Sequence, residues 1–300
     1  MKRFEIEHTT RFAYTGPITE TMMELRLMPL DGRGQRLLEF ALQISPRVKV
    51  ATYRDGYGNL VHYFNLLRAH QKLRVTSRSL IEMDGEFGKG GGPRGGSAEH
   101  GDEGGRPPFE QSEDDLVWDF LRFREPVTDE PGVHVLAARH APTDPASGPA
   151  VEKALESLTV AISHDFTYDP AVTNVYTGVG EVLELRAGVC QDFAHLFIAA
   201  ARAMGVPARY VSGYIHVPGA GGVTEGASHA WAEAWVPGTG WVGFDATHPI
   251  RAGENHVRVA VGRDYRDAAP TRGVYVGIAS GAMIVNVRTR GLEAEPNLGP

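Results

Sequence analysis

The chain has a single cysteine, Cys190, within the segment Gly188-Val189-Cys190-Gln191-Asp192. An apolar stretch with helical spacing follows it, so we expect Cys190 in the first turn of a helix, with Gly188 allowing an unusual backbone turn just before. There the free backbone N–H groups and the positive end of the helix dipole favour a thiolate and could hold an oxyanion during acyl transfer. A buried structural cysteine is the alternative, and the position after a glycine at a helix start favours a nucleophile.

A histidine and an aspartate follow in two strand-like segments. In residues 228–236, SHAWAEAWV, His229 shares one face with Trp231, Glu233 and Trp235, and alanines occupy the other. Asp245 lies in the apolar segment 241–247, where a carboxylate costs free energy unless a partner binds it. A neighbouring strand that carries His229 would supply that partner, fix the imidazole tautomer and stabilise the imidazolium.

Each of these two residues also has an ordinary interpretation. His229 alone would be a half-buried histidine, and Asp245 alone would close a turn with Thr247. The order cysteine, histidine, aspartate, on a helix start and two consecutive strands, is more specific than any one of its parts.

The other candidate groups favour structural roles. Asp192 and His195 have helical spacing, but two ligands make no metal site. We expect Asp192 to serve the helix N-terminus by its charge and His195 to lie in the core. Trp231 and its tryptophan neighbours could form an aromatic wall for a substrate, and core packing is the favoured role.

Composition narrows the class of protein. Hydrophobic residues make up 42% and charged residues 22% of the 300 residues, which is enough for a sizeable core. The net charge of −7 disfavours a nucleic-acid binder. One cysteine excludes a disulfide within the chain. The opening residues lack an apolar signal region, and the longest weakly polar run, 193–206, is too short to span a bilayer, so we expect a cytoplasmic protein without a membrane partner.

Periodicity indicates the elements that must position these groups. The first eighty residues alternate with a period of two, as in Phe4, Ile6, His8 and Thr10, and a turn signal occupies 55–59, which predicts an antiparallel sheet or sandwich. Helical spacing follows over 147–162 and 190–204. Strands are expected at 209–215, 228–236 and 241–247, and a β-rich tail over 257–290, so the fold class is α+β.

Residues 84–107 differ from the rest of the chain. They contain ten glycines and almost no apolar residue, so burial cannot offset their ordering entropy, and we expect a flexible loop or linker. A phosphate-binding glycine loop would need a Gly-Lys-Ser/Thr ending, which is missing here.

Three segments resemble the core motifs of the transglutaminase-like superfamily: GVCQDFAHLFIAAARAMGVPARYVSGY, SHAWAEAWV and GWVGFDATH. Three further segments resemble the N-terminal region of the bacterial branch of this superfamily: HTTRFAYTGPI, MELRLMP and YRDGYGN. A segment near the end of this chain, VRVAVGRDYRDAAPTRGVY, also resembles that branch. The resemblance implies a papain-like α+β core with an N-terminal antiparallel β-sandwich region and a β-rich C-terminal tail. We expect domains at 1–110, 111–256 and 257–300. The glycine-rich loop 84–107, which the resemblance does not cover, lies at the end of the first.

The same resemblance implies a catalytic triad in which Cys190 is the nucleophile, His229 the base and Asp245 the orienting acid. Ala246 departs from the pattern, since the motif usually has proline there. A side chain upstream of the cysteine often completes the oxyanion hole in such folds, and here Asn174 or Tyr176 could do so. Gln191 and Trp231 are further candidates for oxyanion or substrate contacts.

The expected activity is cysteine-dependent acyl transfer on a peptide or protein amide, with no cofactor and no metal. Water as the acceptor makes the protein a peptidase or amidase, and an amine makes it a transglutaminase. Family analogy favours hydrolysis. A non-catalytic binding scaffold is the rival from another class, and the presence of all three candidate residues disfavours it.

Overall fold

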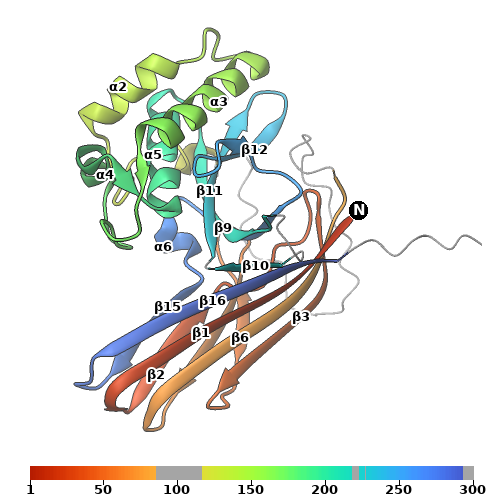
Figure 1. The fold of residues 1–300 in the computed structure, drawn as a ribbon, viewed down its shortest axis with the longest axis vertical. Coiled ribbons are helices and arrows are strands. Elements are labelled where there is room, and N and C mark those ends of the chain that lie inside the picture. The colour runs from red at the N-terminus through yellow and green to blue at the C-terminus, as the bar shows by residue number, and fades with distance from the viewer. Residues whose placement is uncertain (86–116, 218–222, 227, 293–300) are drawn as a thin grey trace, which may run out of the picture. The chain divides into compact units, whose positions relative to one another are not determined.

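The computed structural model describes residues 1–85, 117–217, 223–226 and 228–292. The glycine-rich stretch 84–107 lies outside the described residues from residue 86 onward, so its flexibility stays a prediction. The described chain contains both helices and antiparallel sheets, which confirms the α+β class (Figure 1).

The chain divides into two compact units. The first consists of the described residues within 1–87, 211–230 and 253–300, and the second of those within 88–210 and 231–252. Two strands, β9 (Ala208–Ile215) and β11 (His229–Val236), each run from one unit into the other. The domain boundaries expected from the sequence stay a prediction.

Two antiparallel sheets build the first unit. One has the strand order β10-β16-β1-β6-β3 and the other β15-β2-β5-β4. Their bounds are β1 Lys2–Ile18, β2 Glu20–Leu25, β3 Gln35–Ser45, β4 Ala51–Arg54, β5 Leu60–Leu66, β6 His70–Met83, β10 Val223–Gly226, β15 Thr271–Val276 and β16 Gly281–Leu292. Side chains from both sheets share one apolar cluster, among them Met23, Phe64 and Leu73. The sandwich predicted from the alternation is therefore present.

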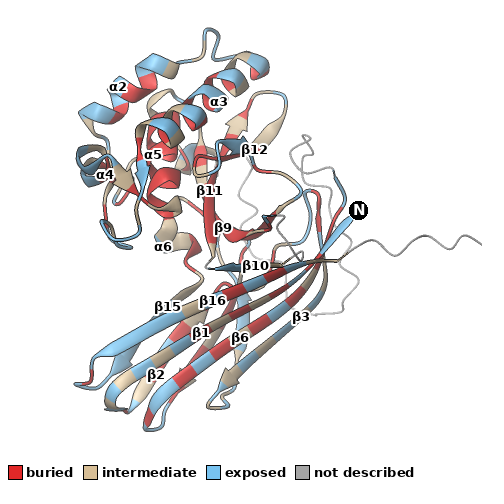
Figure 2. Cartoon of the chain, in the orientation of Figure 1, coloured by how far each residue is buried: buried red, intermediate tan, exposed pale blue. Residues whose placement is uncertain are grey.

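The alternation along β1 matches its burial. Phe4, Ile6, His8 and Thr10 are all buried, while the residues between them are exposed or half-buried (Figure 2). β1 pairs with β6 on one side and with β16 on the other, from Arg3↔Leu292 to Tyr14↔Gly281. The first and last described strands of the chain are therefore neighbours in one sheet.

The predicted turn at 55–59 is also present. The Asp55 carboxylate accepts the backbone N–H groups of Tyr57 and Asn59, at 3.0 Å each. Gly58 has a φ of +81°, a conformation that favours glycine.

In the second unit, helices surround α5 (Cys190–Ala203). α2 (Pro131–His140), α3 (Gly148–Asp165) and α4 (Val179–Leu185) all pack against it (Figure 1). α3 follows the sequence prediction: the Ser147 hydroxyl accepts the N–H of Ala150, and the apolar face that begins with Val151 and Leu155 is buried. α2 and α4 were not predicted.

A third sheet has the order β13-β12-β11-β9-β14. It contains β12 (Gly240–Asp245), β13 (Ile250–Arg251) and β14 (His256–Gly262) besides the two strands named above. The expected strand over 241–247 thus ends two residues early, at Asp245. The short strands β7 (Thr167–Tyr168) and β8 (Ala187–Gly188) pair in parallel, and α6 (Tyr265–Ala268) is one turn long.

The helices that the structure describes include none that is both long and apolar enough to cross a bilayer.

Candidate active site

Cys190 is the first residue of α5 and is half-buried. Val189 precedes it in an extended conformation, and the N–H of Phe193 donates to the Val189 carbonyl at 3.0 Å. Backbone N–H groups of a first helical turn have no partner within the helix. The predicted placement of the sulfur at a helix start is therefore confirmed.

Asp192 caps this helix start from within. Its side chain is fully buried, and Oδ2 accepts the N–H of Val189 at 2.8 Å and the hydroxyl of Thr173 at 2.6 Å. Burial raises the pKa of the Asp192 carboxyl above its usual range, and the two hydrogen bonds oppose that shift. Asp192 thus stabilises the helix N-terminus, as expected, and it does so by accepting the buried N–H of Val189.

Gly188 serves a purpose other than the one expected. Its φ lies outside the left-handed region, so no unusual turn requires glycine there. A Cβ at this position would lie 2.8 Å from the Cβ of Asp192, closer than real Cβ atoms approach. The close packing of Asp192 therefore explains the glycine.

β11 and β12 are adjacent antiparallel strands, as expected from the sequence, with Ala232 opposite Phe244. His229 begins β11 and is buried. Asp245 ends β12 and is fully buried.

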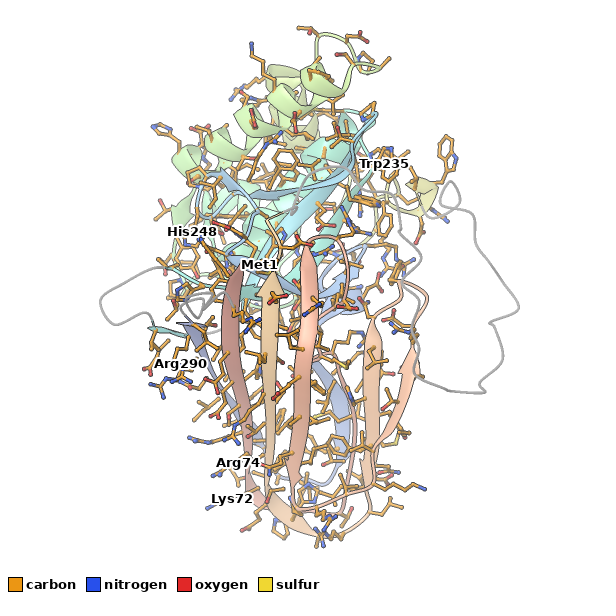
Figure 3. All side chains as sticks on the ribbon, turned by 90° about the vertical axis from the view of Figure 1, so that its right-hand side faces the viewer. Met1, Lys72, Arg74, Trp235, His248 and Arg290 are labelled. Atoms are coloured by element: carbon orange, nitrogen blue, oxygen red, sulfur yellow. The ribbon has the colours of Figure 1, made fainter. Side chains whose placement is uncertain are left out.

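The Asp245 carboxylate closes a turn and binds a histidine. Oδ1 accepts the N–H of Thr247 at 2.9 Å and that of His248 at 3.3 Å, and Oδ2 lies 3.0 Å from Nδ1 of His248. The turn with Thr247 that the sequence left open is therefore present. His248, whose side chain is 43% exposed, was not considered from the sequence; it is labelled in Figure 3.

His229 belongs to the same cluster. One nitrogen of His229, one oxygen of Asp245 and one nitrogen of His248 all lie within 4.8 Å of one another. Two imidazoles and a carboxylate are also ligand types that zinc accepts. No metal was expected from the sequence, and His248 is the residue that completes this group.

The sequence comparisons match most of the chain. A model described as the transglutaminase-like superfamily matches residues 138–246, and one described as the bacterial transglutaminase-like N-terminal region matches residues 4–82. An uncharacterised protein of Mycobacterium tuberculosis is 34% identical over 285 residues, covering 91% of this chain and 87% of its own. The chain belongs to the transglutaminase-like superfamily.

Two further similarities cover different extents. A candidate cysteine protease from Cytophaga hutchinsonii has the same fold, with a TM-score of 0.73, 21% identity and coverage of 99% of this chain and 92% of its own. The protein-glutamine gamma-glutamyltransferase of Pseudomonas aeruginosa is 35% identical over 107 residues, which is 32% of this chain and 16% of that protein. The superfamily match includes all three predicted triad residues, so they lie in its core region.

The other predicted site residues fall into two groups. Asn174, Tyr176 and Gln191 lie on or against one turn: the Asn174 side-chain oxygen accepts the N–H of Tyr176 at 2.9 Å, and the Gln191 amide lies 3.4 Å from the Val175 carbonyl oxygen. Tyr176 is 81% exposed. Trp231 instead has 1% of its surface exposed, which fits the core-packing role that the sequence favoured. Their contacts with an oxyanion or substrate stay predictions.

Two buried polar residues have structural partners. The His195 ring is tilted against Tyr210 at 5.1 Å between centroids, in the core as expected. Glu233 pairs with Arg209, whose guanidinium also lies 4.2 Å from the Trp241 ring centroid. Arg209 thereby neutralises the carboxylate closest to His229 along β11.

Proposed function

We propose that this protein is a cysteine-dependent hydrolase of peptide or amide bonds that works through a thioester on Cys190. The position of this cysteine carries the proposal. Cys190 is the first residue of α5 and lies within the region, 138–246, that matches a superfamily of cysteine-dependent enzymes. A thiolate at that position gains from the helix dipole and from nearby backbone N–H groups.

The proposed reaction has two steps. His229 takes the thiol proton, and the Cys190 sulfur attacks the amide carbonyl, so that a C–S bond forms. The C–N bond then breaks, and the departing amine takes the proton from His229. Water next attacks the thioester, giving the free acid and returning the thiol. Asp245 orients the imidazole and stabilises its protonated form.

Transamidation is the second candidate, and the similarity to the Pseudomonas protein-glutamine gamma-glutamyltransferase favours it. The chemistry is the same up to the thioester. An amine in place of water then forms a new amide. The two candidates therefore differ in the acceptor alone.

One experiment distinguishes these acceptors. The protein is incubated with a peptide library and a primary amine, and the products are identified by mass spectrometry. Hydrolysis gives products that gain water, and transamidation gives products that gain the amine. Peptides unchanged by the wild-type chain, together with a Cys190 that reacts with iodoacetamide like an ordinary buried thiol, would contradict both candidates and favour a binding scaffold.

A further inference from the structure

Exposed apolar side chains gather on the segment just before α4. Residues 170–177 read PAVTNVYT and carry no charge, although 22% of the chain is charged. Val172 is 38% exposed, Val175 43% and Tyr176 81%, and Tyr168 just before them is 54% exposed. We call these four residues the apolar rim.

The rim is held in place by bonds to the residues around Cys190. The N–H of Asp169 donates to the Gly188 carbonyl at 2.9 Å, and the Thr173 hydroxyl to Asp192 at 2.6 Å. Gln191 reaches the carbonyl of Val175 at 3.4 Å. The start, middle and end of the segment are thus tied to residues 188–192.

Local turn bonds fix the end of the segment that carries Tyr176. The N–H of Asn174 donates to the Thr177 hydroxyl and the N–H of Thr177 to the Asn174 carbonyl, both at 3.0 Å. Thr177 itself is buried. Val175 and Tyr176 therefore belong to a hydrogen-bonded turn, and binding to them would cost little ordering entropy.

Within the rim, Tyr168 lies within electrostatic range of the Cys190 sulfur. Burial is the main cause of the raised pKa of Tyr168, and the charges of Cys190 and Asp192 raise it further. The Tyr168 ring meets Phe193 edge to face at 6.2 Å between centroids. An amide held at Cys190 would have its neighbouring residues beside this surface.

We propose that the apolar rim binds the substrate of Cys190, and that this substrate is a peptide with a large aliphatic or aromatic residue next to the attacked amide. This proposal rests on the proposed function. An apolar side chain of the peptide would cover the exposed side chains of the rim, and the apolar surfaces of the peptide and of the rim would both be removed from water. An acidic residue would lose its hydration there and find no opposite charge in 168–177, where the one charged residue is Asp169.

The test compares two double variants that each replace two exposed valines by serine. Val172→Ser/Val175→Ser alters the rim. Val135→Ser/Val160→Ser is the matched control, because both residues are 55% exposed and lie on α2 and α3. The substrates are N-acetylated peptide amides that differ only in the residue before the attacked amide, which is leucine, phenylalanine, alanine, aspartate or lysine.

We expect wild-type kcat/KM to be at least about tenfold higher for the leucine and phenylalanine peptides than for the aspartate peptide, the size of effect that a hydrophobic pocket gives. The rim variant should lose most of this preference through a higher KM, with kcat retained, and the control should keep it. Equal kcat/KM for all five peptides, or a rim variant that keeps the preference, would overturn the proposal.

A binding measurement separates this proposal from the function on which it rests. Fluorescein-labelled phenylalanine and aspartate peptides are titrated with Cys190→Ser protein and followed by fluorescence polarisation. We expect about tenfold tighter binding of the phenylalanine peptide, lost when the two rim valines are also replaced. Equal affinities would refute the rim as the binding surface, whereas a clear preference without turnover by the wild-type chain would refute only the hydrolase.

Discussion

Two histidines lie near one buried carboxylate at the candidate site. His248 lies within hydrogen-bonding distance of Asp245, and His229 lies in the same cluster. His229 is buried at the start of a strand, while the His248 side chain is 43% exposed and follows a turn. A base held rigidly by a strand is better placed to repeat one proton transfer, so we assign that role to His229.

Single substitutions test this assignment. We expect His229→Ala to lower kcat/KM on one peptide amide by at least two orders of magnitude, and Asp245→Asn by two to four, the range seen for an orienting acid in a triad. His248→Ala should cost less than about tenfold, since Asp245 keeps two backbone N–H donors. A larger loss in His248→Ala than in His229→Ala would make His248 the base.

The sequence predicted the position of Cys190 and the neighbouring strands of His229 and Asp245, because each position follows from local periodicity. It did not reveal His248. The expected strand ran through Thr247, and the chain instead turns after Asp245, which brings a residue three positions later back to the carboxylate. Turns that depend on a buried side chain have no periodic signal.

At the scale of the element, the start of α5 depends on a buried carboxyl. The pKa of Asp192 is raised chiefly by burial, so the folded state resists its ionisation. The unfolded chain loses this proton at lower pH, and the free energy of unfolding therefore falls as pH rises from the unfolded value toward the raised one. Asparagine would keep an acceptor for Thr173 and Val189 without a charge.

We therefore expect Asp192→Asn to gain stability relative to the wild-type chain as pH rises above about 4, the ordinary pKa of an aspartate in the unfolded chain. Urea unfolding at several pH values measures the difference, with Asp169→Asn as the control, because Asp169 is only half-buried and accepts one backbone N–H. A difference that stays constant or shrinks with rising pH would mean that burial of this carboxyl is not the dominant effect.

Neither of two helices near α5 has a side-chain cap at its start. Glu130 precedes α2 without a side-chain cap, so nothing but Pro131 marks its start. α4 has seven residues, contains Gly180, and ends at Arg186 in a left-handed conformation where glycine is usual. Both α2 and α4 pack against α5, and this packing stabilises them. Such long-range packing leaves no signal in the local sequence.

Across the whole molecule, the last two described strands, β15 and β16, pair with the first two, β2 and β1. β16 pairs with β1 over twelve residue pairs, and β15 pairs with β2 over six. The sequence predicted a β-rich tail but not its partners, since strand pairing at this separation is set by tertiary packing. Without these strands, β1 and β2 would each expose an edge.

We expect a chain that ends at Gly262 to lose cooperative folding. Far-UV circular dichroism and size-exclusion chromatography would show loss of the thermal transition and aggregation. A cooperative transition with a Tm within about 10 °C of that of the full chain corresponds to a loss of at most a few kcal/mol in the free energy of unfolding. That result would mean that β15 and β16 are dispensable.

A buried histidine in the first unit gives the whole chain an acid-sensitive stability. Burial lowers the pKa of His8 to about 4, and its ring nitrogens lie 3.0 Å from the hydroxyls of Tyr214 and Thr10. The unfolded chain binds this proton below about pH 6.5, so the stability is fully present above that pH and is lost as pH falls toward 4.

The free energy of unfolding should therefore fall by up to about 3 kcal/mol through this one group between pH 6.5 and pH 4. The substitution His8→Asn should reduce the change of the free energy of unfolding with pH between pH 6.5 and pH 4, as measured by urea unfolding. His164→Asn is the control, because that side chain is 86% exposed. Equal slopes in the wild type and His8→Asn would assign the acid sensitivity elsewhere.

The proposed reaction depends most on a covalent bond between the substrate acyl group and Cys190. The direct measurement quenches the wild-type protein with acid during turnover of a leucine-containing peptide amide, then digests it and determines the masses of the fragments. We predict an acyl adduct on the fragment that contains Cys190, removable by hydroxylamine, and no adduct or turnover in Cys190→Ala. An adduct on another residue, or turnover by Cys190→Ala near the wild-type rate, would contradict the assignment of Cys190 as the nucleophile.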